Sequence, residues 1–278
     1  MTAGLVVALW GPTGAPGVST VAAALAGELA AAMRVILVDA NLTRGALGVL
    51  LKAAQGGNIV SATRFPAPRG AACAPGQLQD HRAGFRLLPG IPGPAQGLSV
   101  EPTALAAVLD RLRGAADLVL VDVGSRLVVP PAGMAAAGSD AGSGHAAALA
   151  AADLALVIAR ATRLGVSDLL LQYPLLDQAL ARGAGAGTAE RWCVLNNGSG
   201  RRMRTDEGRV TGALGGRTDG EAPLRVVAYL PHHHEAVDDA EEQGLPVTVA
   251  RRDSPLSRAI LPVADRLAAA ADRRRAAP

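Results

Sequence analysis

The chain has 278 residues, of which 50% are apolar but only 2% aromatic, and its formal net charge is +3. This length is ample for a buried core, and the charge is too small to predict nucleic-acid binding by itself. No apolar run is long enough to span a membrane, and the N-terminus lacks the charged start and cleavage site of a signal peptide. The two cysteines, Cys73 and Cys193, fit no metal or redox spacing. We therefore expect a cytoplasmic protein that does not act on membranes.

Apolar runs alternate with segments of helical periodicity along most of the chain. The predicted strands are 4–10, 34–39, 85–88, 117–122, 153–159, 191–196 and 225–230. The predicted helices are 19–33, 101–114, 144–152, 164–182, 233–243 and 254–272, with a short helix near 58–64. This alternation predicts a doubly wound α/β fold, in which helices cover both faces of a mostly parallel sheet. We expect a single domain over 1–278, with variable or mobile loops at 54–84, 123–143 and 198–222.

A glycine-rich loop follows the first predicted strand and precedes the first predicted helix. Residues 11–17 read Gly-Pro-Thr-Gly-Ala-Pro-Gly. A strand, a tight loop and a helix N-terminus in this order form an anion-binding site, because the loop's N–H groups and the helix dipole point at one spot. Gly14 and Gly17 allow the backbone to come close to a phosphate, and Ser19 stands where a Walker A loop places its magnesium-binding hydroxyl. The alternative is a strand-to-helix turn that binds nothing.

Two later strands end in aspartate. The strand 34–39 closes on Asp39, and the strand 117–122 closes on Asp122, which a valine and a glycine follow. An apolar strand that ends in an acid before a glycine is a Walker B pattern, whose carboxylate holds magnesium directly or through water. The alternative is that each aspartate only begins a turn after a buried strand.

Together, the loop and the two aspartates resemble those of the MinD/ParA family of P-loop NTPases, which belongs to the SIMIBI class, and in particular its CpaE/TadZ-like branch. Later landmarks in the family's order extend the resemblance over nearly the whole chain. The Gly-Ala-Pro-Gly form of the loop is similar to that of actinobacterial relatives. The resemblance implies ATP or ADP with Mg²⁺ as cofactor, and protein partners in a pilus, secretion or division apparatus.

The resemblance also implies roles for individual residues. The nucleotide-binding residues would be Gly14, Ala15, Pro16, Gly17, Val18, Ser19, Thr20, Asn196 and Pro231, and the magnesium ligands would be Ser19, Asp39 and Asp122. Within this set, Asn196 matches the asparagine that reads adenine, and Pro231 begins a segment that packs beside the base. Considered without the family, Asn196 is a turn former, because Asn197 and Gly198 follow it.

Two lysines of active family members are missing from the loop. Thr13 stands where they carry a signature lysine that reaches the partner subunit's nucleotide, and Val18 stands in place of the Walker lysine. The only lysine of the chain is Lys52. An ammonium beside a phosphate interacts at roughly 4 kcal/mol at 4 Å and an effective dielectric of 20, so its loss predicts weak nucleotide binding. Pro16 further removes one backbone donor from the loop.

A third departure concerns catalysis. Asn41 replaces an aspartate that, in active relatives, helps to place or activate the attacking water. An amide can orient a water but cannot accept its proton as a carboxylate does, so no residue is assigned a catalytic role. Arg44 on the same loop is either a substitute charge for a phosphate or a solvated loop residue.

Three basic clusters have simple explanations. Consecutive histidines at 232–234 point in different directions at a helix start and do not converge on one metal ion. Arg201, Arg202, Arg204 and Arg209 occur in a glycine-rich loop without interleaved aromatics, which indicates a disordered loop more than a nucleic-acid surface. The arginines at 273–275 follow an alanine-rich helix that lacks the apolar face of a membrane-targeting helix.

These features predict a spatial-organising or scaffold protein, acting in pilus assembly, septum placement or partition, whose ATP hydrolysis is absent or weak. One alternative is a working ATPase in which arginines replace the lysines. Another is an interaction protein that binds no nucleotide. We expect a homodimer whose mass does not respond to ATP, with a monomer as the alternative, because the cross-subunit lysine is replaced by Thr13.

Overall fold

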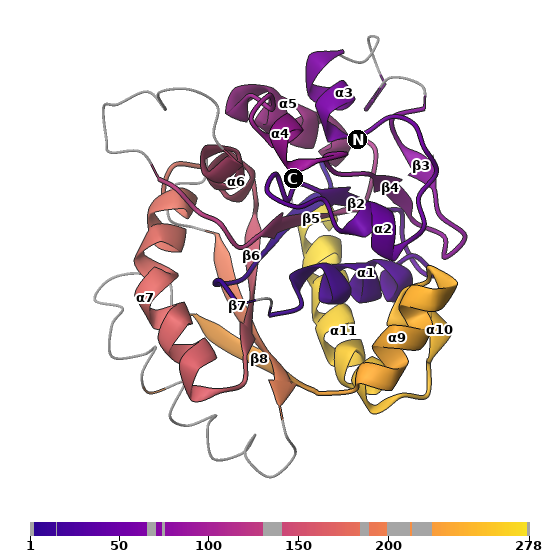
Figure 1. The fold of residues 1–278 in the computed structure, drawn as a ribbon, viewed down its shortest axis with the longest axis vertical. Helices are drawn as coiled ribbons and strands as arrows, with labels where there is room; N and C mark the ends of the chain where they lie inside the picture. The colour runs from indigo at the N-terminus through magenta and orange to yellow at the C-terminus, as the bar shows by residue number, and fades with distance from the viewer. Residues whose placement is uncertain are drawn as a thin grey trace.

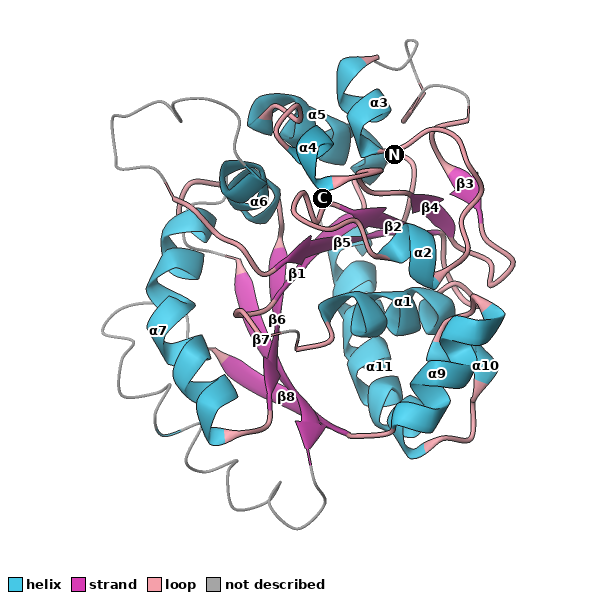
Figure 2. Ribbon diagram, viewed as in Figure 1, coloured by secondary structure: helices cyan, strands magenta, loops and turns pink. Residues whose placement is uncertain are grey.

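The computed structural model describes residues 3–14, 16–65, 71–73, 76–129, 141–183, 189–198, 212 and 224–276. Its sheet has the strand order β3-β4-β2-β5-β1-β6-β7-β8, and every neighbouring pair is parallel except β3 and β4. Helices cover both faces of the sheet (Figure 1, Figure 2). The predicted α/β architecture is therefore confirmed.

The elements have the following bounds. The strands are β1 (Leu5–Trp10), β2 (Val35–Asp39), β3 (Gln79–Asp80), β4 (Arg86–Leu88), β5 (Leu118–Gly124), β6 (Leu154–Arg160), β7 (Glu190–Gly198) and β8 (Arg225–Pro231). The helices are α1 (Val18–Leu29), α2 (Leu47–Leu50), α3 (Ile59–Arg64), α4 (Pro94–Gly97), α5 (Pro102–Arg113), α6 (Ala141–Ala150), α7 (Arg163–Leu180), α9 (His234–Gln243), α10 (Val247–Ala250) and α11 (Pro255–Ala276). All seven predicted strands and all seven predicted helices are present.

A hydrophobic core lies on each face of the sheet. Side chains alternate between the faces along β1: Val6, Ala8 and Trp10 enter one core, and Leu5, Val7 and Leu9 enter the other. The first core is covered by α3, α5, α6 and α7, and the second by α1, α9, α10 and α11 (Figure 1). Burial on both faces explains why the central strands read as continuous apolar runs in the sequence.

The sequence missed the shortest elements and misjudged several boundaries. β3, α2, α4 and α10 have two to four residues each, which is too short for a hydrophobic period to show. Within 54–84, α3 is the short helix expected near 58–64 and β3 was not expected, while 66–70 and 74–75 lie outside the described residues. In the predicted loop 123–143, the first residues belong to β5 and the last ones to α6, and residues 130–140 are not described. Most of 198–222, with its four arginines, also lies outside the described residues.

The central strand β1 lies between β5 and β6. The chain forms β2 to β5 on one side of β1 and then β6 to β8 on the other side. In open α/β sheets, such a reversal of strand order opens a crevice at the carboxyl ends of the strands, where ligands bind. The loop after β1 and the ends of β2 and β5 all lie at this edge. The fold therefore brings the sequence-predicted site together.

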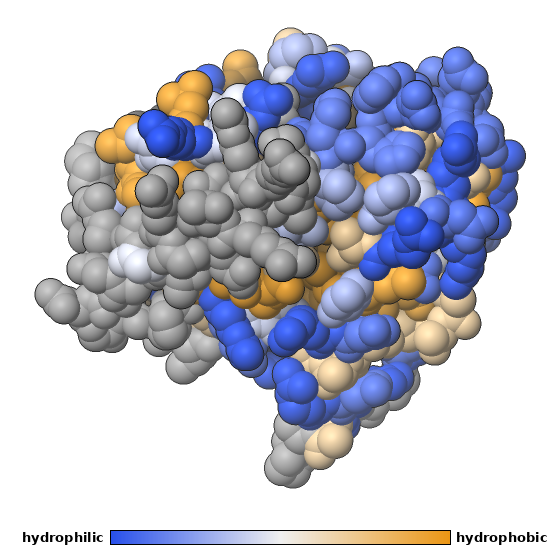
Figure 3. Space-filling model, turned by 90° about the horizontal axis from the view of Figure 1, so that it is seen from below, coloured by the Kyte–Doolittle hydropathy of each residue, from blue (hydrophilic) through white to orange (hydrophobic). Residues whose placement is uncertain are grey.

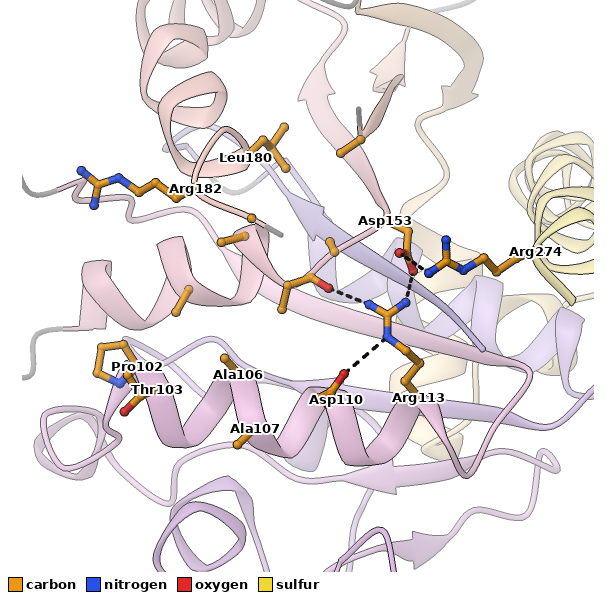
Figure 4. Close-up of a pocket in the computed structure, with 16 residues that line it drawn as sticks. Pro102, Thr103, Ala106, Ala107, Asp110, Arg113, Asp153, Leu180, Arg182 and Arg274 are labelled. Carbon is orange, nitrogen blue, oxygen red and sulfur yellow. Dashed lines mark hydrogen bonds and ion pairs between the residues drawn. The ribbon is translucent and has the colours of Figure 1, made fainter. Parts of the chain in front are cut away.

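Ion pairs connect segments at the opposite side of the sheet, where the parallel strands begin. Arg113 of α5 donates to Asp153 at 2.6 Å and to the Ala151 carbonyl at 3.0 Å, and Arg274 of α11 pairs with the same aspartate at 3.3 Å (Figure 4). These residues lie at one end of a cavity of about 880 Å³ whose walls include alanines of α5 and α6. Arg274, near the C-terminus, thus contacts the body of the domain and connects α11 to the start of β6.

The exposed large apolar side chains of the described residues are spread over several elements, although Leu164 and Leu171 both belong to α7. In Figure 3, hydrophilic side chains predominate among the described residues at the right of the view, and apolar ones show in small areas between them. Among the helices of the described residues, none has both the length and the apolar character that crossing a bilayer requires.

Asp117, at the start of β5, is the second acidic group of this edge. Arg34 donates to it from its main-chain N–H at 2.9 Å and from its guanidinium at 2.8 Å, and Arg275 pairs with it at 3.3 Å. The hydrogen bonds from the Arg34 side chain lower the pKa of Asp117 to about 2. Since this pKa is below the unfolded value of 3.8, the carboxylate stabilises the fold fully above about pH 4, and the effect is lost as pH falls through 2.

We therefore expect Asp117→Asn to lower the free energy of unfolding by about 1 kcal/mol at pH 7, after allowance for the exposed Arg34 side chain. The difference from wild type should shrink as pH falls from 4 to 2. Urea unfolding at several pH values measures it. A difference that stays constant over this range would show that the charge of Asp117 contributes nothing.

Candidate functional site

The loop between β1 and α1 has the backbone shape of an anion cradle. Gly14 and Gly17 have φ of +107° and +88°, values that favour glycine, and Gly17 is the N-terminal cap of α1. The first N–H groups of α1 have no partner within the helix and point toward the loop. Ala15 lies outside the described residues. The remaining positions follow the strand–loop–helix order that the sequence predicted, and the binding role of 14–20 stays a prediction.

Neighbouring elements hold this loop on three sides. The Gly11 N–H donates to the Gly124 carbonyl at 3.2 Å, and the Asn196 amide of β7 donates to the Pro16 carbonyl at 2.7 Å. On the third side, Gln172 of α7 donates to the Thr13 hydroxyl at 3.2 Å. The loop is thus held by contacts to β5, β7 and α7. The Thr13 hydroxyl, at the position where the resemblance implied a lysine, is thus bonded to α7.

Asp39 and Asp122 lie side by side at the ends of β2 and β5. They are paired in the register of the two strands, and both are fully buried. The Ser19 hydroxyl of α1 donates to Asp122 at 2.5 Å, and the Gly124 N–H donates to it at 3.0 Å. Asp39 accepts the Leu47 N–H at 2.9 Å. The three residues that the sequence predicted as magnesium ligands therefore meet at one place.

The two carboxylates are costly to ionise without a cation. Burial raises the pKa of Asp39 well above its usual range, and the charge of Asp122 raises it further. Burial likewise raises the pKa of Asp122 to about 6, although the Ser19 hydroxyl acts in the opposite direction. Buried like charges are relieved by a bound cation, and carboxylate and hydroxyl oxygens are ligands that Mg²⁺ prefers. The residues present therefore fit the ion that the resemblance implies.

Comparison with solved structures identifies the architecture. The septum site-determining protein MinD complexed with Mg-ADP, from Pyrococcus horikoshii OT3, matches with a TM-score of 0.72 and 17% identity, over 97% of this chain and 98% of that one. A ParA family ATPase from Chlorobium tepidum TLS matches with a TM-score of 0.72 and 17% identity, over 94% of this chain and 98% of that one. The chain has the MinD/ParA fold. A MinC:MinD cell division protein complex from Aquifex aeolicus matches with a TM-score of 0.69 and 17% identity, over 95% of this chain and 96% of that one. No protein-family model and no curated protein matches the sequence.

The loop after β1 and the first turn of α1 contain no lysine. Val18, the first residue of α1, is only 6% exposed and packs in the core beneath the loop. The ammonium of Lys52 is hydrogen-bonded to the Glu242 carbonyl at the end of α9, at 2.5 Å. Arg44, the residue expected as a substitute charge or a solvated side chain, is exposed, and its N–H donates to Asn41. Lys52 therefore has a structural contact away from the loop.

Asn41 organises the loop after β2. Its side-chain oxygen accepts the Thr43 hydroxyl at 2.7 Å and the Thr43 and Arg44 N–H groups at 3.3 and 3.1 Å. The same side chain lies against Gly124, where a Cβ would come within 2.6 Å of the Asn41 Cγ. Sequence reasoning assigned this position only to the orientation of water. Its contacts show that it also shapes the loop.

A cavity of about 200 Å³ opens beside the cradle. Its lining includes Gly17, Thr20 and Asn196, and also the three histidines at 232–234. It lies where the resemblance places a base, although the Asn196 amide already supports the loop through Pro16. Pro231 ends β8 immediately before these histidines.

The histidines lie at the start of α9. His233 caps this helix by accepting the Ala236 N–H at 3.3 Å, and the rings of His232 and His234 stack with centroids 5.6 Å apart. Among the described residues, no group of three or more histidine, cysteine or acidic side chains could hold a metal. The cap formed by His233 agrees with the expectation that the histidines begin a helix. Sequence reasoning missed their place beside the cavity, for which the only signal was that they follow Pro231.

Proposed function

We propose that this protein is a CpaE/TadZ-like spatial-organising or scaffold protein that binds ATP or ADP weakly with Mg²⁺ and hydrolyses ATP slowly or not at all. One observation supports this proposal above all others. The glycine loop and the carboxylate pair have the arrangement that a phosphate and a magnesium ion need, whereas the Walker position holds the buried side chain of Val18. The site has the shape for a phosphate and lacks the lysine charge that would make binding tight.

The proposed roles of the residues follow from their positions. The N–H groups at Gly17, Val18 and Ser19 would hold phosphate oxygens at the start of α1. The Ser19 hydroxyl and the carboxylates of Asp39 and Asp122 would hold the ion, directly or through water. Bound Mg²⁺ supplies positive charge that neutralises phosphate oxygens. The cavity beside Gly17 would take the base.

The contacts of Asn41 favour slow hydrolysis. Its oxygen already accepts bonds from Thr43 and Arg44, so it offers little to an attacking water, and an amide cannot accept the proton of that water. The missing lysines remove charge that would stabilise phosphoryl transfer. Each loss acts on a different part of the reaction, so their effects on the rate combine.

The proposed partners are proteins of a division, partition, pilus or secretion apparatus. The MinC:MinD complex illustrates a protein of this fold bound to another division protein. We further propose that the chain acts as a single domain in the cytoplasm, as a homodimer whose mass is insensitive to ATP. Thr13 offers a dimer no lysine to reach the partner's nucleotide, and its hydroxyl already accepts a bond from Gln172.

We expect purified protein to hydrolyse ATP with Mg²⁺ at less than about a hundredth of the rate of an active ParA-type control, since loss of one charge-stabilising group alone often costs 10²-fold or more. Phosphate release measured against Asp122→Ala gives the background. A rate comparable with the control protein, abolished by Asp122→Ala, would overturn the proposal.

That outcome would support the second candidate, an ATPase in which arginines replace the lysines. The observation that favours it is the position of Arg160, which ends β6 opposite Asn196 in the register and is exposed at the same edge of the sheet. Arg44 is likewise exposed nearby in the loop after β2. Arg44→Gln and Arg160→Gln would then each lower the rate of hydrolysis.

A further inference from the structure

A buried histidine links the two loops that follow the carboxylates. His145 of α6 is fully buried. Its Nε2 accepts the Leu42 N–H at 2.9 Å, and its Nδ1 is hydrogen-bonded to the Arg126 carbonyl. Because a main-chain N–H can only donate and a carbonyl can only accept, the ring is neutral and carries its proton on Nδ1. The imidazole therefore ties together two segments that are far apart in the sequence.

Each linked residue lies just beyond one carboxylate. Leu42 belongs to the loop after Asp39, here called the β2 loop and comprising residues 40–46. Arg126 belongs to the segment after Asp122, here called the β5 loop and comprising residues 125–129. Any movement of one carboxylate that shifts its loop therefore acts on the imidazole.

The helix that carries His145 also packs closely on the β2 loop. A Cβ at Gly144 would come within 2.4 Å of Leu42 Cδ1, so the absence of a side chain lets α6 approach this loop. Leu42 and Leu127, one from each loop, are buried in the same hydrophobic core. Packing and hydrogen bonds thus converge on the same three segments.

Nearer the carboxylates, the strand ends are joined by other contacts. The Ala40 N–H donates to the Asp122 carbonyl at 2.8 Å, and Asn41 lies against Gly124. These contacts hold the strand ends, whereas His145 holds the loops farther from the sheet. Without its acceptor, the buried Leu42 N–H would be left unpaired, which is strongly disfavoured.

We propose that His145 is a positioning residue that makes the β2 loop and the β5 loop move as one unit with α6. A change at either carboxylate then reaches both loops and the helix. The coupling rests on contacts within the chain itself. Only the identity of its trigger, a nucleotide with magnesium, rests on the proposed function. A histidine that merely filled the core would stabilise the fold without making one loop respond to the other.

Two substitutions remove the two ends of this link separately. In His145→Asn, the amide nitrogen takes the place of Nδ1 and keeps the bond to Arg126, but Leu42 loses its acceptor. In His145→Gln, the longer side chain places its oxygen near the position of Nε2 and keeps the bond to Leu42, but Arg126 loses its donor. Amide hydrogen exchange should show the Leu42 N–H exchanging at least tenfold faster in His145→Asn than in His145→Gln.

The coupling itself is measured with a disturbance confined to one loop. Thr43→Val removes the hydroxyl that donates to Asn41 and keeps the side-chain shape. In the otherwise wild-type protein, we expect it to speed exchange in both loops. In either His145 variant, it should affect the β5 loop at least threefold less. An equal effect on the β5 loop with and without His145 would overturn the proposal, as would no effect on that loop in the wild type.

A measurement without substitutions covers the case in which the variants fail to fold. Relaxation dispersion on the wild-type protein should give the same exchange rate for the Leu42 and Leu127 amides, and different rates would contradict the proposal. Mg-ADP provides the remaining arm: it should shift resonances of both loops in the wild type and mainly those of the β2 loop in His145→Gln. If Mg-ADP does not bind, the proposed function fails, while the nucleotide-free measurements still decide on His145.

Discussion

Val18→Lys is expected to raise the affinity for Mg-ATP at least tenfold. Val18 is the first residue of α1, so the longer stem of a lysine would extend beyond the space that the valine fills and bring its ammonium toward the cradle. Attraction between a cation and a phosphate at about 4 Å amounts to roughly 4 kcal/mol at an effective dielectric of 20, and about 1.4 kcal/mol corresponds to tenfold in affinity. Desolvation of the ammonium offsets part of this gain. Isothermal titration calorimetry measures the result.

Val18→Met is the matched control, because methionine extends into the same space without charge. It should bind nucleotide no better than the wild type. If the lysine and methionine variants bind equally well, the gain comes from packing and not from charge. If neither differs from a wild type that already binds ATP tightly, the missing lysine does not limit binding.

Asp122→Asn is expected to stabilise the nucleotide-free protein at pH 7 by about 2 kcal/mol, and to remove the effect of Mg²⁺ on nucleotide binding. Since the folded pKa of Asp122, about 6, is above the unfolded value of 3.8, ionisation destabilises the fold increasingly as pH rises between them. The amide removes this cost, and the Ser19 hydroxyl can rotate to accept from it. Thermal unfolding should show a midpoint several degrees higher.

Asp39→Asn provides the matched control, because it relieves the same repulsion from the other strand. The two gains should be less than additive when combined, since one carboxylate alone no longer meets a like charge. Destabilisation by both single variants would contradict this account. It would show that the ionised pair stabilises the nucleotide-free fold.

The carboxylate pair illustrates what the sequence could predict. The strands that carry Asp39 and Asp122 are apolar runs buried on both faces, which are easily recognised in the sequence. That the two aspartates meet near Ser19 was implied by the family resemblance, and the parallel strands bring them to a common edge. The loop shape followed from Gly14 and Gly17 for the same kind of local reason.

Contacts between distant segments could not be predicted in this way. Nothing near Asn196 indicates that its amide supports Pro16, 180 residues away. The bond between His145 and Leu42 spans 103 residues, and a histidine in an alanine-rich helix gives no local signal of it. The arginines at the end of α11 likewise find Asp117 and Asp153 only once the sheet is formed.

The most direct test of the central claim is calorimetric titration of the wild-type protein with ATP, with and without Mg²⁺. A cradle without its lysine should bind with a dissociation constant above about 100 µM, since the missing interaction corresponds to roughly a thousandfold in affinity. Magnesium should strengthen binding, because the ion relieves the buried Asp39–Asp122 pair. Low-micromolar binding by the wild type would contradict the claim that the cradle keeps its backbone shape but binds nucleotide weakly.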